Sequence, residues 1–308
     1  MNRIKPPVLT YGLAVFLLAS PVRSAPAVET VEKSFPVDRT QPVMFSFENN
    51  DGDLRFSVWE KDLVEVRVKK EVRTANEKRA RRLLEDTEVQ FSQNKNSIRV
   101  RIRYPRRRGY FLRISPSQRV KVSTEVMLPA ASHLRCEMDD GTIYGGGVRG
   151  DLNLHVDDGS IRVSRIQGFI RASCDDGRVI LEDIEGGADV ACDDADIRIS
   201  GTLGRLRIRT DDGDIDIEVR APSAMEEDWE VTADDGDVTL YVSETFSAGL
   251  AFSTDNGKIS SELPVALKGL VSRTRFSGTL NQGGHLIRIK TDDGNISLKK
   301  GNGDFPLR

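Results

Sequence analysis

The sequence has little of what most enzymes use for chemistry. Its 308 residues include 3 histidines and 3 cysteines, and aromatic residues make up 6% of the chain. His133, His155 and His285 show no metal-ligand spacing, and no Gly-x-Ser-x-Gly, phosphate-loop or zinc motif occurs. So low an aromatic content also argues against a large aromatic-lined pocket. We therefore predict a protein that is not an enzyme and that holds no cofactor and no metal.

Long apolar runs are missing as well, except at the N-terminus. There the basic Arg3 and Lys5 precede an apolar stretch over residues 11–20, which small residues follow. A membrane span needs ~20 apolar residues, so this stretch is too short for one. We predict a signal peptide over residues 1–27, cleaved after Ser24 or Ala27. The expected location is periplasmic, extracellular or at the cell surface, with no transmembrane segment after signal removal.

A repeat dominates the C-terminal part of the chain. An acidic pair, followed by glycine in all units but one, starts every 18 residues from Asp139 to Asp211. Further starts follow at Asp234, Asp255 and Asp292, with Asn256 in place of the second acid in one of them. Within each unit apolar and polar residues alternate, as in short β-strands. A unit of this size cannot bury its own apolar side, so the units must stack. An antiparallel sandwich would explain the alternation but not the strict spacing.

The sequence therefore predicts an all-β fold, a parallel β-solenoid (β-helix) of ~18-residue coils over residues 139–308. The longer units keep their corners, so residues 221–229, 244–249 and 263–284 are expected to loop outward. In solenoids such insertions can form the binding surface.

The Asp-Gly corners allow two interpretations. Asp and Gly are turn residues, because Asp can bond its own backbone and Gly accepts a positive φ. The predicted structural turns contain Gly141, Gly159, Gly177, Gly213, Gly236, Gly257 and Gly294. Alternatively, stacked carboxylates could bind Ca²⁺, with Asp140, Asp158, Asp176, Asp194 and Asp212 as weak candidates. We favour the turn role, because Ala195 and Asn256 interrupt the pattern and the acids are spread over every coil.

Residues 28–138 are predicted to form an N-terminal coil and a capping region. Asn50-Asp51-Gly52 repeats the corner once, and Thr74-Ala75-Asn76-Glu77 has the pattern of a helix start, which predicts a helix over about 75–86. Residues 53–125 hold 20 Lys/Arg and 10 Asp/Glu, whereas residues 139–218 hold 9 and 19. Such an asymmetry can reflect a partner surface.

Arginines gather near the end of the capping region. Arg99, Arg101 and Arg103 alternate with apolar residues and therefore share one face of a strand. A basic loop follows. The possible anionic-ligand patch consists of Arg101, Arg103, Arg106, Arg107 and Arg108. The alternative is an exposed face that is solvated by arginine or paired with neighbouring acids.

The cysteines have places in the repeat. Cys174 and Cys192 occupy the same position of adjacent coils and are expected to be neighbours. They form either a buried apolar pair, which we favour, or a disulfide. Cys136 is expected to pack as a small apolar residue.

Several elements together resemble one bacterial family. They are Phe45-Ser46-Phe47-Glu48-Asn49-Asn50-Asp51-Gly52-Asp53-Leu54, Trp59, the helix-bearing insert, Met127-Leu128-Pro129-Ala130 and the repeated (Asp/Asn)-Gly units. The chain is similar over nearly all its mature length to the β-strand-repeat domain of unknown function that carries the label "putative adhesin". The resemblance implies a β-solenoid in an exported or envelope-associated protein. It implies no catalytic residues.

The sequence thus predicts an exported, non-enzymatic β-solenoid that serves as an envelope-associated, adhesin-like binding or scaffold protein. Its expected partner is a protein or glycan of the cell envelope, and nucleic acid is not expected. Two alternatives stay open, namely a polysaccharide-acting lyase or hydrolase on a β-helix and a calcium-stabilised structural solenoid.

Overall fold

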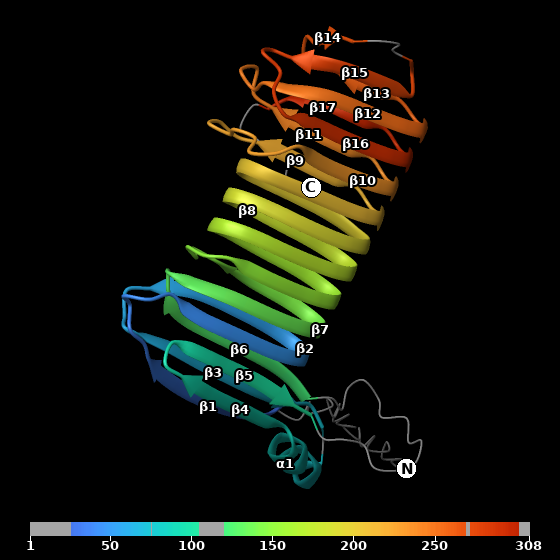
Figure 1. The fold of residues 1–308 in the computed structure, drawn as a ribbon. Coiled ribbons are helices and arrows are strands. Elements are labelled where there is room, and N and C mark those ends of the chain that lie inside the picture. Colours follow the sequence, from blue (N-terminus) through green and yellow to red (C-terminus); the bar gives the residue numbers. More distant parts are fainter. Residues whose placement is uncertain (1–25, 75, 105–119, 269–271, 302–308) are drawn as a thin grey trace, which may run out of the picture.

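The structure is a computed structural model that describes residues 26–74, 76–104, 120–268 and 272–301. Its described residues form one helix and 17 strands, stacked into a long, narrow body (Figure 1). The elements are β1 (Ala27–Pro36), β2 (Val43–Trp59), β3 (Leu63–Val72), α1 (Glu77–Asp86), β4 (Glu88–Asn94), β5 (Ser97–Arg103), β6 (Val120–Pro129), β7 (Ser132–Gly146), β8 (Leu152–Asp212), β9 (Ile215–Val219), β10 (Trp229–Asp235), β11 (Val238–Val242), β12 (Ala248–Asn256), β13 (Ile259–Ser261), β14 (Ala266–Leu267), β15 (Arg275–Leu280), β16 (Leu286–Asp293) and β17 (Ile296–Lys300). The all-β prediction is confirmed.

The 18-residue repeat appears as parallel pairing between successive coils. Leu134 pairs with Leu152, and Ile197 pairs with Ile215, each 18 residues further along the chain. The long strand β8 winds through several coils without a break (Figure 1). Each coil therefore has two sides, one before the acidic corner and one after it, and every side joins the same side of the next coil.

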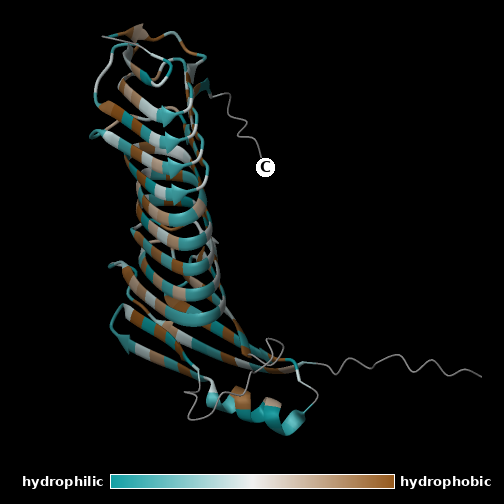
Figure 2. Ribbon diagram, turned by 90° about the vertical axis from the view of Figure 1, so that its right-hand side faces the viewer, coloured by the Kyte–Doolittle hydropathy of each residue, from teal (hydrophilic) through white to brown (hydrophobic). Residues whose placement is uncertain are grey.

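The coils stack because their inward side chains form continuous apolar rows. The fifth position of the repeat is buried in coil after coil, at Ile143, Ile161, Val179, Ile197 and Ile215. Outward residues between them are polar or charged, and Figure 2 shows the resulting alternation along the strands. Fully burying one such side chain contributes about 1.5–3 kcal/mol, so the rows are a main source of stability.

The sheet is mixed, and this corrects the prediction of a wholly parallel solenoid. Parallel pairing prevails in the middle of the stack, whereas antiparallel pairs close both ends. At the N-terminal end, β1 pairs with β3, β3 with β6 and β4 with β5, all antiparallel. At the C-terminal end, β15 pairs antiparallel with β12 and with β14. These strands cover the parallel edges that a bare stack would leave exposed.

The order of the coils also departs from the order of the chain. The last coil, β16–β17, lies between β10–β11 and β12–β13, although β12–β13 comes before it in the sequence. The first coil behaves similarly, since β2 lies between β7 on one side and β5 and β6 on the other. Sequence periodicity defines the register of a coil but not its neighbours, because every coil presents the same apolar rows.

All three predicted outward loops need correction. In residues 244–249, Phe246 is buried and Ala248 and Gly249 begin β12. Trp229 is fully buried and begins β10, where its indole nitrogen donates to the carbonyl oxygen of Gly204 at 3.0 Å. Residues 263–284 contain β14 and β15, which form the cap at the C-terminal end.

The corners bend the strand without forming separate reverse turns. At Gly213 the φ angle is 130°, and a β-carbon there would overlap the carbonyl oxygen of Ala195 in the preceding coil. Glycine is needed there for its backbone conformation and for the close approach of two coils. Of the predicted corner glycines, Gly141, Gly159, Gly177, Gly213 and Gly236 have positive φ, and Gly257 and Gly294 do not.

The helix of the cap begins two residues later than the sequence indicated. Its N-cap is Asn76, whose side chain accepts the backbone N–H of Arg79 at 3.0 Å, so the cap is not Thr74. Ala80 and Leu84 are the buried residues of its apolar face. At its C-terminal end the buried Lys70 donates to the carbonyl oxygens of Leu84 and Thr87, at 2.8 and 3.0 Å.

The three cysteines are buried and free. Cys174 and Cys192 are neighbours, as expected, with their sulfur atoms 3.4 Å apart. Their contact and burial raise the pKa of the Cys174 thiol, and burial raises the pKa of Cys136. Along the described ranges no helix is long and apolar enough to cross a membrane. The predicted signal peptide lies outside the described residues except for its last two positions.

Candidate binding surfaces

The Asp-Asp corners line up as two rows of acids along one narrow edge of the stack, which we call the acidic edge. Asp140 is paired with Asp51 and Asp158 on its two sides, and Asp235 with Asp212 and Asp293. The first row contains Asp139, Asp157, Asp175, Asp193, Asp211, Asp234, Asp292 and Asp255, and the second contains Asp51, Asp140, Asp158, Asp176, Asp194, Asp212, Asp235 and Asp293.

The close spacing of like charges along the acidic edge affects the pKa of its carboxyl groups. Lost hydration and neighbouring carboxylates raise the pKa of Asp158, Asp194 and Asp235 above the usual Asp range. The five predicted calcium candidates all lie on this edge, each in a different coil. Within the part of the chain that the structure describes, no group of three or more His, Cys, Asp or Glu residues is arranged to hold a metal ion.

The acidic residue directly after the corner glycine has a structural role that was not predicted from the sequence. The carboxylate of Asp214 accepts the backbone N–H of Asp237 at 2.9 Å, and that of Asp237 accepts the N–H of Asn295 at 2.7 Å. Asp196 and Asn295 continue this ladder towards the two ends. The signal was present in the sequence as an Asp or Asn directly after the corner glycine or Ala195. These side chains tie one coil to the next.

The predicted arginine patch is only partly described. Arg101 is paired with Glu48 at 2.5 Å, and this contact lowers the pKa of Glu48. Arg103 is exposed at the end of β5. The other three members, Arg106, Arg107 and Arg108, lie outside the described residues. For Arg101 the observed geometry is that of an ion pair with a neighbouring strand.

One constellation with catalytic residue types was not expected from the sequence. The ring of His155 contacts the hydroxyl of Ser173 through Nδ1 at 2.8 Å and the carboxylate of Asp157 through Nε2 at 2.8 Å. Ser173 lies one coil beyond His155 at the same repeat position, and Asp157 is two residues from His155. The serine is half-buried on the outer surface. The 18-residue spacing of His155 and Ser173 would have revealed their contact.

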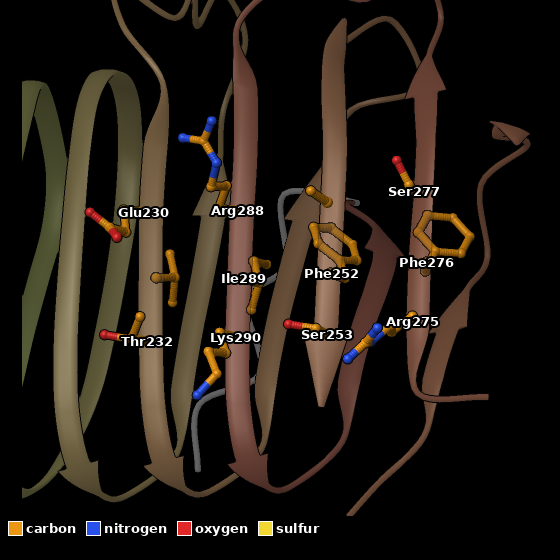
Figure 3. A pocket seen from close by; sticks show the side chains of 12 residues that line it. Glu230, Thr232, Phe252, Ser253, Arg275, Phe276, Ser277, Arg288, Ile289 and Lys290 are labelled. Atoms are coloured by element: carbon orange, nitrogen blue, oxygen red, sulfur yellow. The ribbon is translucent and has the colours of Figure 1, made fainter. Parts of the chain in front are cut away.

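An open groove of about 460 Å³ lies near the C-terminal end, on the side of the stack before the acidic corner (Figure 3). It crosses four neighbouring strands, in the order β10, β16, β12 and β15. The groove forms because β12 carries the short outward side chains Ala251 and Ser253. The strands on both sides of β12 carry long cationic side chains.

Three cations border the groove, which we call the cationic groove. Lys290 and Arg275 are the strand partners of Ser253 on its two sides, and Arg288 is the partner of Ala251. Figure 3 shows Lys290 and Arg275 on either side of Ser253. Adjacent strands are about 4.8 Å apart, so the two cationic strands are about 10 Å apart. The fourth charged lining residue, Glu230, approaches Arg207 of the preceding coil at 3.7 Å.

The opposite side of the stack has a depression of about 360 Å³ with different chemistry. Its charges are largely matched, because Arg178 pairs with Asp196 at 3.1 Å and Arg198 with Asp216 at 3.2 Å. This surface has cations and anions in close contact, whereas the cationic groove has an excess of positive charge.

Comparison with protein-family models gives a match over most of the chain. A family model described as Toastrack DUF4097 matches residues 60–299. No curated protein matches the chain.

Several crystal structures match the chain at low identity. A "putative adhesin" from Bacteroides fragilis is 10% identical, with 89% of this chain and 97% of that chain covered and a TM-score of 0.45. A "putative lipid binding protein" from Parabacteroides distasonis is 12% identical, with coverages of 88% and 94% and a TM-score of 0.39. A "putative cell adhesion protein" from Clostridium sporogenes is 12% identical, with coverages of 89% and 100% and a TM-score of 0.26.

Proposed function

The chain belongs to the Toastrack DUF4097 family, and from this premise we propose that it is an exported, non-enzymatic protein of the cell envelope that binds a partner through the outer surface of its stack. The family is described as a domain of unknown function. The proposal is therefore argued from the surfaces of this chain. The signal-peptide pattern over residues 1–27 supports export.

The arrangement of charge carries the proposal. Acidic residues repeat along a whole edge of the stack, and a group of cations lines a groove on the side before this edge, near the C-terminal end. Both surfaces are open and shallow, and long rows of exposed groups suit contact with an extended partner such as a glycan chain or another protein. Catalytic residues would instead be expected as a local cluster in an enclosed site.

The first experiment locates the chain and its partner. A tagged, full-length chain is expressed in a bacterial host, the cells are fractionated, and exposed amines are crosslinked before purification. The proposal predicts that the tag appears in the periplasm or at the envelope and that a crosslinked envelope protein or glycan co-purifies with it. Recovery of the tagged chain in the cytoplasm alone would contradict the proposal.

A hydrolase is the second candidate, because of the contact of His155 with Ser173 and Asp157. A serine activated by histidine could attack an ester or a substituted glycan. This function predicts turnover of acylated polysaccharides that is lost in Ser173→Ala. Absence of turnover across a panel of glycans and glycan esters would remove this candidate.

A further inference from the structure

We propose that the cationic groove binds an anionic sugar residue of an acidic polysaccharide, with the acid group held over Ser253 between Lys290 and Arg275. The inference rests on the proposed binding function and assigns it a ligand class and a place on the surface. It starts from the charge of the groove, whose lining holds three cations and one acid.

Local charge is the first argument. The coils over residues 139–218 hold 19 Asp/Glu and 9 Lys/Arg, so this part of the stack is acidic overall. The lining of the cationic groove has the opposite balance, with Arg275, Arg288 and Lys290 against one acid, and Arg207 and Arg209 of the adjoining coil extend the positive charge. A departure from the repeat at one place is what a specific site requires, because repeated residues serve every coil alike.

The three cations are available to a ligand. Lys290 approaches Asp292 at 2.6 Å and Arg288 approaches Asp228 at 3.3 Å, but all four side chains are about half exposed. Exposed ion pairs contribute little to stability and can exchange partners readily. Arg275 has no ion-pair partner among the described residues, and its side chain is exposed.

The hydroxyl groups in the groove are the second argument. Ser253 lies in the floor, and Ser277 and Thr232 lie in the lining. A carboxylate or phosphate over Ser253 can accept from its hydroxyl, from the Lys290 ammonium group and from the Arg275 guanidinium group, which are charge-assisted hydrogen bonds. The sugar ring then lies above Ala251 and Ser277, with Arg288 next to its hydroxyl groups.

The geometry favours a sugar over a lipid. The lining has hydroxyl groups, the methyl groups of Ala251 and Thr232 and the partly buried Phe276. The apolar residues under the strands are covered, with Phe252 and Ile289 at 2% and 1% exposure. An acyl chain would need a deep apolar cavity. Stacking of Phe252 on Phe276, with ring centroids 5.8 Å apart, holds β15 against β12 and so fixes the position of Arg275.

The test measures binding of tetragalacturonate, a carboxylated sugar, to the full chain at low salt. Its methyl ester is the neutral control, and mannose 6-phosphate competes for the site if a phosphorylated sugar is accepted. The wild-type chain is expected to bind the acid and not the ester. Arg275→Ala/Lys290→Ala is expected to weaken binding about 100-fold, about tenfold for each charged hydrogen bond lost.

The matched control is Lys258→Ala, which removes an exposed cation on the opposite side of the same end of the stack. It is expected to leave the affinity unchanged. Circular dichroism and the melting temperature check that each variant is folded. Equal binding by Arg275→Ala/Lys290→Ala and the wild-type chain would overturn the inference. So would binding to phosphatidylglycerol vesicles with no binding to either sugar.

Failure of this inference differs from failure of the proposed function. If the groove variants bind tetragalacturonate normally while the tagged chain still crosslinks to an envelope partner, the groove assignment is wrong and the binding function stands. If the tagged chain stays in the cytoplasm, the proposed function is wrong whatever the groove binds.

Discussion

Replacing Gly213 by alanine is expected to destabilise the stack at one corner. The φ angle of 130° is one that residues with a β-carbon rarely adopt, at a cost of about 1–3 kcal/mol. The new β-carbon would also overlap the carbonyl oxygen of Ala195, so the two coils must separate. Separation loosens the hydrogen bond from the Ile197 N–H to the carbonyl oxygen of Asp214, 2.9 Å long, and at least one neighbouring bond. At about 1 kcal/mol each, these bring the total to about 3–5 kcal/mol.

The assay is urea unfolding followed by circular dichroism, with Ala195→Gly as the control. Ala195 occupies the same corner position one coil earlier, and it is not among the residues with positive φ. Its change to glycine should cost only about 0.5–1 kcal/mol through backbone entropy. If Gly213→Ala unfolds at the urea concentration of the wild-type chain, close approach of the coils does not explain the glycine.

Three further predictions concern groups elsewhere in the stack. The raised pKa of Asp194 means that this carboxyl group binds a proton more tightly in the folded state than in the unfolded state, so stability should increase as the pH falls from neutral towards the ordinary Asp value of 3.8. A melting temperature that falls steadily over this pH range would contradict the prediction. Asp194→Asn should reduce the dependence of the melting temperature on pH. Cys174 and Cys192 should resist iodoacetamide in the native chain and react in urea, as mass spectrometry can show, because both thiols are buried. Lys70→Met should destabilise the cap by about 2–4 kcal/mol in thermal unfolding, because the carbonyl groups of Leu84 and Thr87 at the helix end lose a buried donor. An unchanged melting temperature would refute this role.

Much of the fold could be predicted from the sequence because the repeat is strict. The spacing from Asp139 to Asp211 predicts in-register pairing, and Ile197 indeed pairs with Ile215. The helix was predicted within two residues, since its capping residues lie close together in the chain. These features depend on local patterns, which a single sequence contains in full.

The ends of the stack could not be predicted in the same way. Their antiparallel strands depend on which edge is free after the coils have stacked, and that is a property of the whole assembly. The pairing of Arg101 with Glu48 has the same origin, because β2 lies beside β5 although about 50 residues separate the two partners. An arginine row on a strand therefore indicates an exposed face but does not tell which acids lie beside it.

The cationic groove exists because the last coil is out of chain order. If the coils followed the sequence, β12 would lie beside β10, and Ser253 would have Thr232 as its neighbour in place of Lys290. Insertion of β16 between them brings Lys290 and Arg288 against the short side chains of β12, 37 residues earlier in the chain. The antiparallel β15 then supplies Arg275 on the other side. The inserted coil and the capping strand together bring three cations to the two sides of β12, and the ligand should therefore be sought there.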